Sequence, residues 1–321
     1  MCVILYTKIN DKIFLAKNRD KVYKPKINII HEIVDGIEIA YIQDQQTGWV
    51  EGINEKGFGI VNSTININDG KKNINSKYKK IKSSKIFNAL CEDKPKNLIN
   101  NLVKKDDENI FEGNTLIYCD NKLYHLEYNI NQKYTITEAK PNSVYTNHGI
   151  NMPSEGFTTG IKGLSSFMRK SIIEKELKKM VNNIKYKCEN NNKIYNDISN
   201  ILNRDYVNID PRFHPYRDKN TTLKRIKDIE KNQTIVNTTG QLILNITDKE
   251  LVYYGDVNNS KKIKYINKLP SNYIPKIRVL VHYTKKNTKT KKVFQKKNLK
   301  NIYKKFNYNN KTMKNNENNE K

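Results

Sequence analysis

The chain has 321 residues and a formal net charge of +26, with 59 Lys and Arg against 33 Asp and Glu. This length accommodates one large domain or two smaller ones, with a substantial buried core. The charge favours a polyanion-binding protein, but the excess of Lys, Asn, Ile and Tyr is also what an AT-rich genome produces. Base and phosphate readers rely on arginine forks, whereas lysine dominates here. We expect only weak, charge-driven binding of nucleic acid.

The sequence predicts neither a signal peptide nor a membrane span. Its first eight residues, MCVILYTK, lack a cationic segment before the apolar run and a small-residue cleavage site. No apolar stretch has the length that a bilayer requires. The four cysteines show neither a CxxC pair nor zinc-type spacing, so we expect no metal and no other cofactor. We predict a cytoplasmic protein with reduced thiols, and the sequence leaves the oligomeric state open.

The N-terminal half alternates short strands and turns. Cys2–Lys8 and Ile13–Lys17 form a predicted hairpin around an Asn-Asp turn. Further short strands are predicted at Ile37–Ile42, Gly48–Val50 and Gly57–Val61, with glycines marking turns between them. From Ser83 to Val103 the pattern is helical, with a break near Asp93–Pro95.

The C-terminal half adds two more hairpins and two helices. The hairpins are predicted at Asn114–Tyr128, across Asp120-Asn121, and at Gln241–Tyr254, across Asp248-Lys249; the further strands are Tyr134–Ala139 and Ser143–Tyr145, and the helices are Leu164–Met180 and Tyr195–Leu202. Strands at both ends with helices between them indicate an α+β layered fold. Residues 285–321 carry 13 Lys and 2 Glu, a net charge of +11. We predict that this tail is disordered and that the globular domain spans residues 2–284.

Cys2 is the first candidate for chemistry. Methionine aminopeptidase removes an initiator methionine before a small residue, and cysteine is small enough. The mature chain would then begin with a thiol and a free α-amine on one residue. An N-terminal nucleophile can use its own amine as the general base, and the unperturbed pKa of an α-amine, near 8, suits that task. A cysteine at position 2 alone carries little weight.

The predicted hairpin brings Asn18-Arg19-Asp20 back beside Cys2. A cation there would lower the pKa of the thiol, and a carboxylate would hold the α-amine. The same tripeptide recurs at 203–205, so only its position relative to Cys2 gives it weight. The alternative is an exposed polar turn.

Two asparagines at strand ends are candidates for an oxyanion hole. Asn62 follows the turn and buried strand that begin at Gly52, and Asn147 follows a short strand. An Asn in this position can present a backbone N–H or a side-chain amide to a developing negative charge. A plain hairpin is the alternative at Asn62. His148 could form a Cys–His dyad, but nothing in its spacing distinguishes it from the other histidines.

Taken together, four motifs resemble the cysteine-type N-terminal-nucleophile hydrolases: the Cys2 start, Asn18-Arg19-Asp20, the stretch from Asn54-Glu55-Lys56-Gly57 to Asn62, and Thr146-Asn147-His148. The relatives are the choloylglycine hydrolase and penicillin V acylase group and the isopenicillin N acyltransferase-like group. The resemblance covers about residues 2–256. The Thr-Asn-His triplet and the late hairpin favour the acyltransferase-like branch.

This resemblance implies a four-layer αββα sandwich and a site without cofactors. Cys2 would be the nucleophile and its α-amine the base. Arg19 would lie beside the thiol, and Asp20 would orient the amine. Asn62, through its backbone, and Asn147, through its side chain, would form the oxyanion hole. The substrate would be a small-molecule N-acyl amide or acyl donor with a linear, non-peptide C–N bond.

The chain departs from the bile-salt hydrolases at two places. Asp20 follows Arg19 without their spacer residue, and Arg169 is a shifted stand-in for the arginine of their Ser-Arg-Phe stretch. The Met-Cys start and Asn-Arg-Asp also resemble the transport and Golgi organisation family, although Lys21 and Lys24-Pro25 replace the Glu and Arg-Pro usual there. A second alternative is a polyanion-binding protein that acts through its basic tail.

Overall fold

The computed structural model describes residues 2–21, 25–65, 84–104, 112–129, 131–158, 160–183, 190–203, 237–255 and 263–283. All of them belong to one compact unit, Met1–Thr284. The predicted disordered tail, 285–321, lies outside the described residues, so its disorder and the domain boundary at 284 stay predictions.

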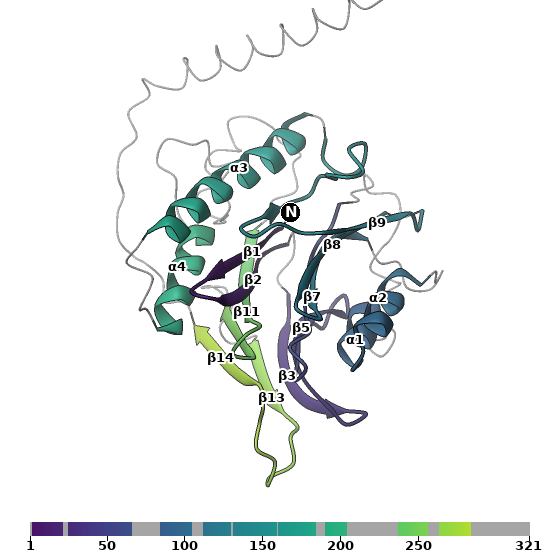
Figure 1. Ribbon diagram of the computed structural model, residues 1–321, viewed down its shortest axis with the longest axis vertical. Coiled ribbons are helices and arrows are strands. Elements are labelled where there is room, and N and C mark those ends of the chain that lie inside the picture. The colour runs from purple at the N-terminus through teal and green to yellow at the C-terminus, as the bar shows by residue number, and fades with distance from the viewer. Residues whose placement is uncertain are drawn as a thin grey trace, which may run out of the picture. The chain divides into compact units, whose positions relative to one another are not determined.

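Two β-sheets form the centre of this unit (Figure 1). The first sheet has the strand order β10 (Val144–Tyr145), β1 (Val3–Ile9), β2 (Lys12–Lys21), β11 (Asn237–Asn245), β12 (Glu250–Gly255) and β14 (Arg278–Tyr283). The second has the order β13 (Ile263–Asn267), β3 (Ile27–Val34), β4 (Ile37–Asp44), β5 (Trp49–Asn54), β6 (Gly59–Ser63), β7 (Gly113–Cys119), β8 (Lys122–Tyr128) and β9 (Tyr134–Glu138). Neighbouring strands are antiparallel except at β12–β14 and β13–β3, which are parallel.

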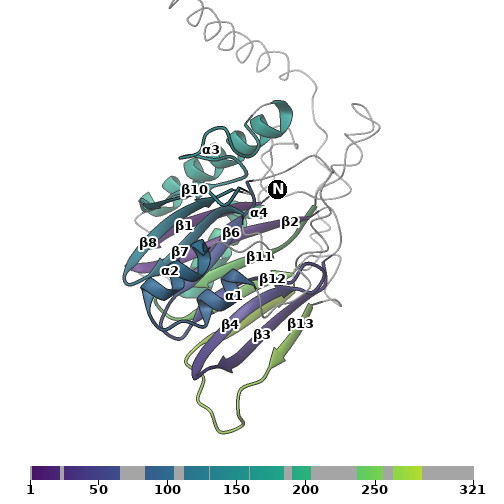
Figure 2. The ribbon, with the colours of Figure 1, turned by 90° about the vertical axis from the view of Figure 1, so that its right-hand side faces the viewer.

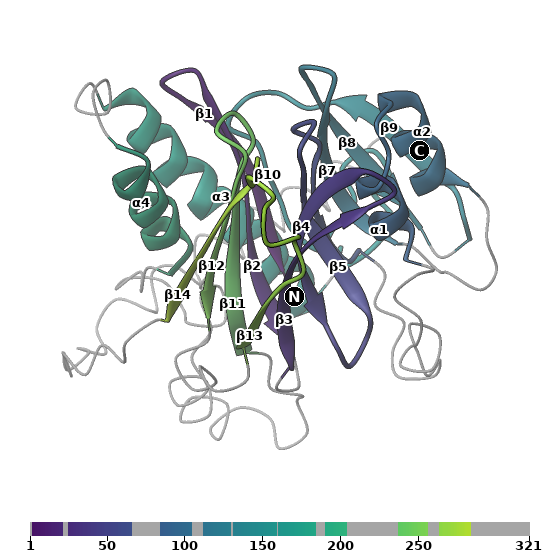
Figure 3. The same ribbon diagram turned by 90° about the horizontal axis from the view of Figure 1, so that it is seen from below.

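Helices cover the outer faces of both sheets. Figure 3 shows the layers in order: α3 (Gly160–Asn182) with α4 (Asn191–Asn203), the first sheet, the second sheet, and α1 (Lys85–Leu90) with α2 (Pro95–Val103). Figure 2 looks onto α1 and α2, with strands of the second sheet behind them. The αββα sandwich expected from the sequence is confirmed. None of the described helices combines the length and apolarity needed to cross a membrane.

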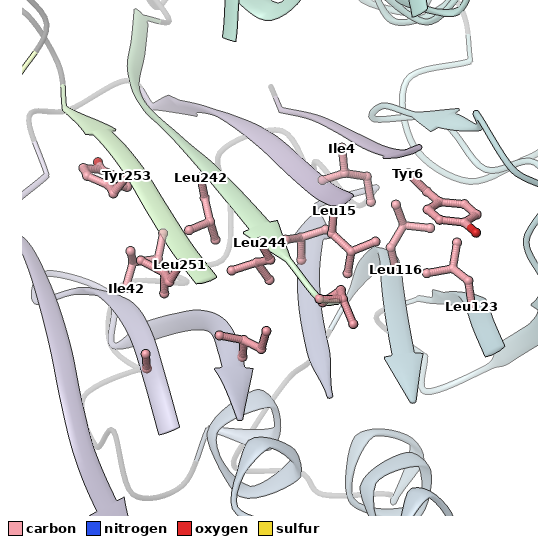
Figure 4. Packing of buried hydrophobic residues seen from close by; sticks show 14 of the residues in the cluster. Ile4, Tyr6, Leu15, Ile42, Leu116, Leu123, Leu242, Leu244, Leu251 and Tyr253 are labelled. Carbon is pink, nitrogen blue, oxygen red and sulfur yellow. The ribbon is translucent and has the colours of Figure 1, made fainter. Parts of the chain in front are cut away.

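Three apolar clusters hold the four layers together. The central one lies between the sheets, where Leu15, Leu242 and Leu251 of the first sheet face Ile42 and Leu116 of the second (Figure 4). A second cluster joins the second sheet to α1 and α2, and a third joins the first sheet to α3 and α4. Side chains alternate between the two faces of a strand, so neighbouring residues of one strand belong to different clusters.

The β1–β2 hairpin is built as its sequence predicts. Asn10 and Asp11 have φ values of 49° and 61°, a left-handed conformation that Asn and Asp tolerate better than most residues. The register pairs Ile9 with Lys12 and Val3 with Asn18. The chain therefore returns to its own start, and residues 18–20 lie beside Cys2.

Three strands, β3, β13 and β14, were not predicted from the sequence. β3 reads INIIHEIV and is buried along its first five residues, so it lacks the alternation typical of a half-buried strand. β13 and β14 pair in parallel with β3 and β12, and parallel neighbours have no local turn that would reveal the pairing. β13 and β14 are edge strands of their sheets, and β14 lies at the opposite end of the first sheet from β10 and β1.

Candidate active site

Cys2 directly precedes β1 and is 6% exposed. Its Sγ lies 3.8 Å from the carbonyl oxygen of Asp20, at the far end of the hairpin. Its own carbonyl oxygen accepts hydrogen bonds from Arg169 Nη1 at 3.0 Å and from Ser63 Oγ at 3.4 Å. The sequence-predicted nucleophile is therefore fixed by residues from the helical layer and from both sheets.

β2 presents its alternate residues to two different layers. Lys17 and Arg19 point between the sheets, where both reach Glu51 of β5. Asn18 points the other way and donates from Nδ2 to the carbonyl oxygen of Leu202 in α4, over 2.8 Å. This alternation follows from strand geometry. It places the cations of β2 on the buried, inter-sheet side.

Glu51 is the centre of a buried charged cluster. Its Oε2 accepts from Arg19 Nη1 at 2.7 Å, while Oε1 binds Lys17 Nζ and accepts from the backbone N–H of Asn62 at 2.8 Å. Asp44 lies 3.5 Å from Arg19 Nη2. Burial raises the pKa of the Glu51 carboxyl, but the cations of Lys17 and Arg19 outweigh burial and lower it overall. Glu51 therefore stays ionised between the sheets.

Lys17 also influences the thiol. Burial raises the pKa of Cys2, but the positive charges of Lys17 and, more weakly, of the terminal amine and Lys21 lower it, and the net shift is downward. A lowered thiol pKa increases the fraction of nucleophilic thiolate. Arg19, which was expected beside the thiol, lies opposite Cys2 in the hairpin register and is 0% exposed.

Asp20 is held from the neighbouring strand β11. Its Oδ1 accepts from the hydroxyl of Thr238 at 2.8 Å, and Thr239 donates to the carbonyl oxygen of Arg19 at 3.0 Å. Both threonines therefore fix the end of β2 where it meets Cys2. The role of Asp20 towards the α-amine stays a prediction.

Asn62 lies in the site, but its backbone and side-chain N–H groups donate to other protein groups. Its backbone N–H, which was expected to face an oxyanion, is donated to Glu51, and its side-chain amide is donated to Thr115 Oγ1 at 2.8 Å and to the carbonyl oxygen of Glu112 at 3.3 Å. The buried carboxylate competes for the N–H because a charged acceptor forms the stronger hydrogen bond. In this geometry Asn62 ties β6 to the charged cluster, and its role in an oxyanion hole stays a prediction.

Asn147 and Arg169 form a pair beside Cys2. Arg169 Nη2 donates to Asn147 Oδ1 at 3.0 Å, and its Nη1 holds the Cys2 carbonyl. The Nδ2 of Asn147 donates to the carbonyl oxygen of Thr64 at 2.7 Å and to Ser63 Oγ at 3.2 Å. Arg169, the shifted stand-in from the sequence, is thus brought together with Cys2 and Asn147.

The loop that carries Asn147 is fixed to α3. The hydroxyl of Ser166 accepts from the backbone N–H of Asn147 at 2.9 Å and lies 2.9 Å from Nδ1 of His148. Burial lowers the pKa of His148 to about 4, so this ring is neutral at pH 7. It pairs with hydroxyl groups and with the ring of Phe167 at 4.1 Å, not with the thiol of Cys2.

Several residues of this site were not predicted from the sequence, chiefly Lys17, Asp44, Glu51, Ser63, Ser166 and Thr238. One signal was available for Lys17: it follows Ile13 and Leu15 on the face of β2 that fills the core. A charged residue on a buried face requires a partner. The partner could not be identified from the sequence, because Glu51 belongs to the other sheet and is 34 residues away along the chain.

Comparison with known proteins identifies the fold. Neither a protein-family model nor a curated protein sequence matches the chain, but solved structures do. The C2A variant of conjugated bile acid hydrolase from Clostridium perfringens is 12% identical with a TM-score of 0.50, covering 86% of this chain and 100% of its own. An arginine-to-leucine variant of that enzyme is 11% identical with a TM-score of 0.50, covering 81% of this chain and 90% of its own.

Penicillin V acylase from Agrobacterium tumefaciens is 12% identical with a TM-score of 0.43, covering 82% of this chain and 88% of its own. At such identities, only the fold follows from the likeness. From the two bile acid hydrolase structures, the chain has the four-layer fold of conjugated bile acid hydrolase.

Proposed function

We propose that the protein is an amide hydrolase that acts on linear, non-peptide C–N bonds of N-acyl compounds through Cys2. One observation carries the proposal: Arg169 bridges the carbonyl of Cys2 and the side-chain oxygen of Asn147, with both bonds at 3.0 Å. A nucleophile and a candidate oxyanion donor are thereby held in one fixed arrangement. Such preorganisation is what acyl transfer requires.

The reaction would proceed in two steps, once removal of Met1 has freed the α-amine of Cys2. The amine takes the thiol proton, sulfur attacks the amide carbonyl, and a tetrahedral oxyanion forms. The C–N bond then breaks, the leaving amine takes the proton, and an acyl thioester remains on Cys2. Water attacks the thioester, releasing a carboxylic acid and restoring the thiol. An acceptor amine in place of water would give acyl transfer.

Asn147 supplies the oxyanion contact in this proposal. Of its two Nδ2 bonds, the one to the Ser63 hydroxyl is longer, 3.2 Å against 2.7 Å to the Thr64 carbonyl. A substrate oxygen that replaced the Ser63 hydroxyl would accept the freed N–H. Arg169 would keep the amide oriented, because its Nη2 occupies the Oδ1 side.

The test uses an activated acyl probe and intact-mass measurement. The processed wild-type protein should lack Met1 alone and gain one acyl group, whereas Cys2→Ala should gain none. Cys119→Ala is the matched control, because burial raises the pKa of the Cys119 thiol to about 11 and leaves it unreactive. Equal labelling of Cys2→Ala and wild type would disprove the mechanism. A panel of N-acyl amides, bile-salt conjugates and penicillins then identifies the acyl and amine groups.

A further inference from the structure

Lys17 shares a buried compartment with the candidate nucleophile. The β1–β2 register pairs Ile4 with Lys17 and Val3 with Asn18, so Cys2 lies opposite Arg19 and diagonal to Lys17. Ile4 faces the inter-sheet core, and Cys2, two residues earlier, faces the same way. Diagonal neighbours on one face of an antiparallel pair are within reach of a long side chain.

Glu51 fixes the position of the Lys17 ammonium. Lys17 is 4% exposed, and its Nζ binds Glu51 Oε1, the same oxygen that accepts the N–H of Asn62. The other oxygen of Glu51 binds Arg19. A lysine is almost never buried this deeply without a partner, and here the partner holds the cation between the strands that meet at Cys2.

We propose that Lys17, held by Glu51, is a positioning residue whose ammonium stabilises the thiolate of Cys2 during the reaction. The inference rests on the proposed function, in which Cys2 is the nucleophile. It adds a residue that neither the sequence motifs nor the hydrogen bonds of Cys2 single out.

The charges around the thiol come from several elements, and Lys17 is the dominant cation. They belong to Lys17, Arg19, Asp20 and Lys21 of β2, Asp44 of β4, Glu51 of β5, Arg169 of α3 and the terminal amine. Among the cations, Lys17 has the largest effect in lowering the pKa of Cys2, against the upward effect of burial. Arg19 is balanced by two carboxylates, Glu51 and Asp44.

The test measures the rate at which iodoacetamide alkylates Cys2 as a function of pH, followed on the Cys2 peptide by mass spectrometry. Lys17→Met keeps the buried alkyl stem and removes the charge. The midpoint of the profile should move upward, and alkylation at pH 7 should slow about tenfold. Lys17→Arg should restore most of the rate. Lys85→Met is the matched control, because Lys85 is also buried, at 6% exposure against 4% for Lys17, but lies on α1 in another layer.

Circular dichroism identifies variants that fold. If Lys17→Met does not fold, Lys17→Met/Glu51→Gln removes both members of the ion pair and should still show the raised midpoint. An unchanged midpoint in either folded variant would overturn the proposal, and so would an equal shift in Lys85→Met. Alkylation needs no amide substrate. A wild-type protein that hydrolyses no amide would therefore overturn the proposed function without affecting this result.

Discussion

Arg169 holds Asn147 by its side-chain oxygen, over 3.0 Å, and leaves the amide nitrogen of that residue pointing at Ser63 and Thr64. The same guanidinium holds the carbonyl of Cys2. Arg169 and Asn147 are 22 residues apart and come from different elements, a helix and a loop. Their contact turns two separate sequence motifs into one arrangement around the thiol.

Asn147→Asp should strongly reduce activity and preserve the fold. A carboxylate at this position still accepts from Arg169, and more strongly than an amide does. It loses the N–H donors and places negative charge beside the developing oxyanion, so kcat should fall by about 10²–10³. Steady-state kinetics and thermal unfolding measure the two effects. Wild-type turnover in folded Asn147→Asp would remove Asn147 from the oxyanion hole.

Arg169→Lys should reduce activity although it keeps the charge. Lysine is a point donor and cannot span the Cys2 carbonyl and Asn147 together, as the guanidinium fork does. We expect kcat/KM to fall by about tenfold or more. Lys170→Arg is the control, because it makes the reverse exchange, lysine to arginine, at the neighbouring position. Lys170 is half-buried and pairs with Glu174, so this variant should retain wild-type kinetics. Equal kinetics for Arg169→Lys and wild type would show that the fork is dispensable.

Glu51→Gln should destabilise the protein more than Glu38→Gln does. Both carboxylates are buried in the second sheet, but Glu51 balances two cations, whereas Glu38 accepts from His31 and from the backbone N–H groups of Lys276 and Ile277. Removing one partner of a buried ion pair costs about 3–5 kcal/mol. Urea unfolding of both variants at pH 7 checks the order. Equal free energies of unfolding would mean that the inter-sheet charges contribute little.

Local sequence signals were sufficient for part of this site. The Asn-Asp turn at Asn10 sets the register that brings Arg19 and Asp20 to Cys2, because a hairpin is fixed by a few consecutive residues. Strands at both ends with helices between them also indicated a layered α+β fold, whereas the αββα order was implied only by the family resemblance. Contacts between the layers cannot be predicted from a few consecutive residues in this way. The Lys17–Glu51 pair, the Ser166–Asn147 bond and the parallel strand β14 each join segments that only the packed sheets bring together.

The orientation of Asn62 illustrates a second limit. Its place at the end of β6 was predictable, and this place alone suggested a free donor. Whether a backbone N–H is available depends on the nearest acceptor, and here that acceptor is Glu51 from the adjacent strand. A donor role can be inferred from sequence only when every competing acceptor is known.

The basic tail should be dispensable for amide hydrolysis. Deleting residues 285–321 removes a net charge of +11 and leaves in place all of the described residues that contact Cys2. We expect unchanged kcat/KM, together with weaker and less salt-dependent binding to a polyanion such as heparin. Kinetic assays and affinity measured at several salt concentrations separate the two functions. Loss of amide hydrolysis in a folded deletion variant would contradict the proposed independence.

Acid should destabilise the protein through two of its buried histidines, His125 and His148. His125 and His148 are at most 2% exposed, and burial lowers their pKa values to about 3 and about 4. Below the ordinary histidine pKa of about 6.5, the unfolded chain binds protons that the folded chain does not, so stability falls as the pH drops from about 6.5 to about 4. For His148 this window corresponds to roughly 3 kcal/mol.

Urea unfolding between pH 7 and pH 4 measures this loss. The double variant His125→Gln/His148→Asn keeps polar atoms near the ring nitrogens that bond Asn114 and Ser166 and does not titrate. Its free energy of unfolding should decline less steeply than that of wild type over the same range, with the carboxylates contributing equally to both. Parallel declines in the two proteins would assign the acid sensitivity to those carboxylates, which include Glu51 and Glu38, whose pKa values are lowered in the fold.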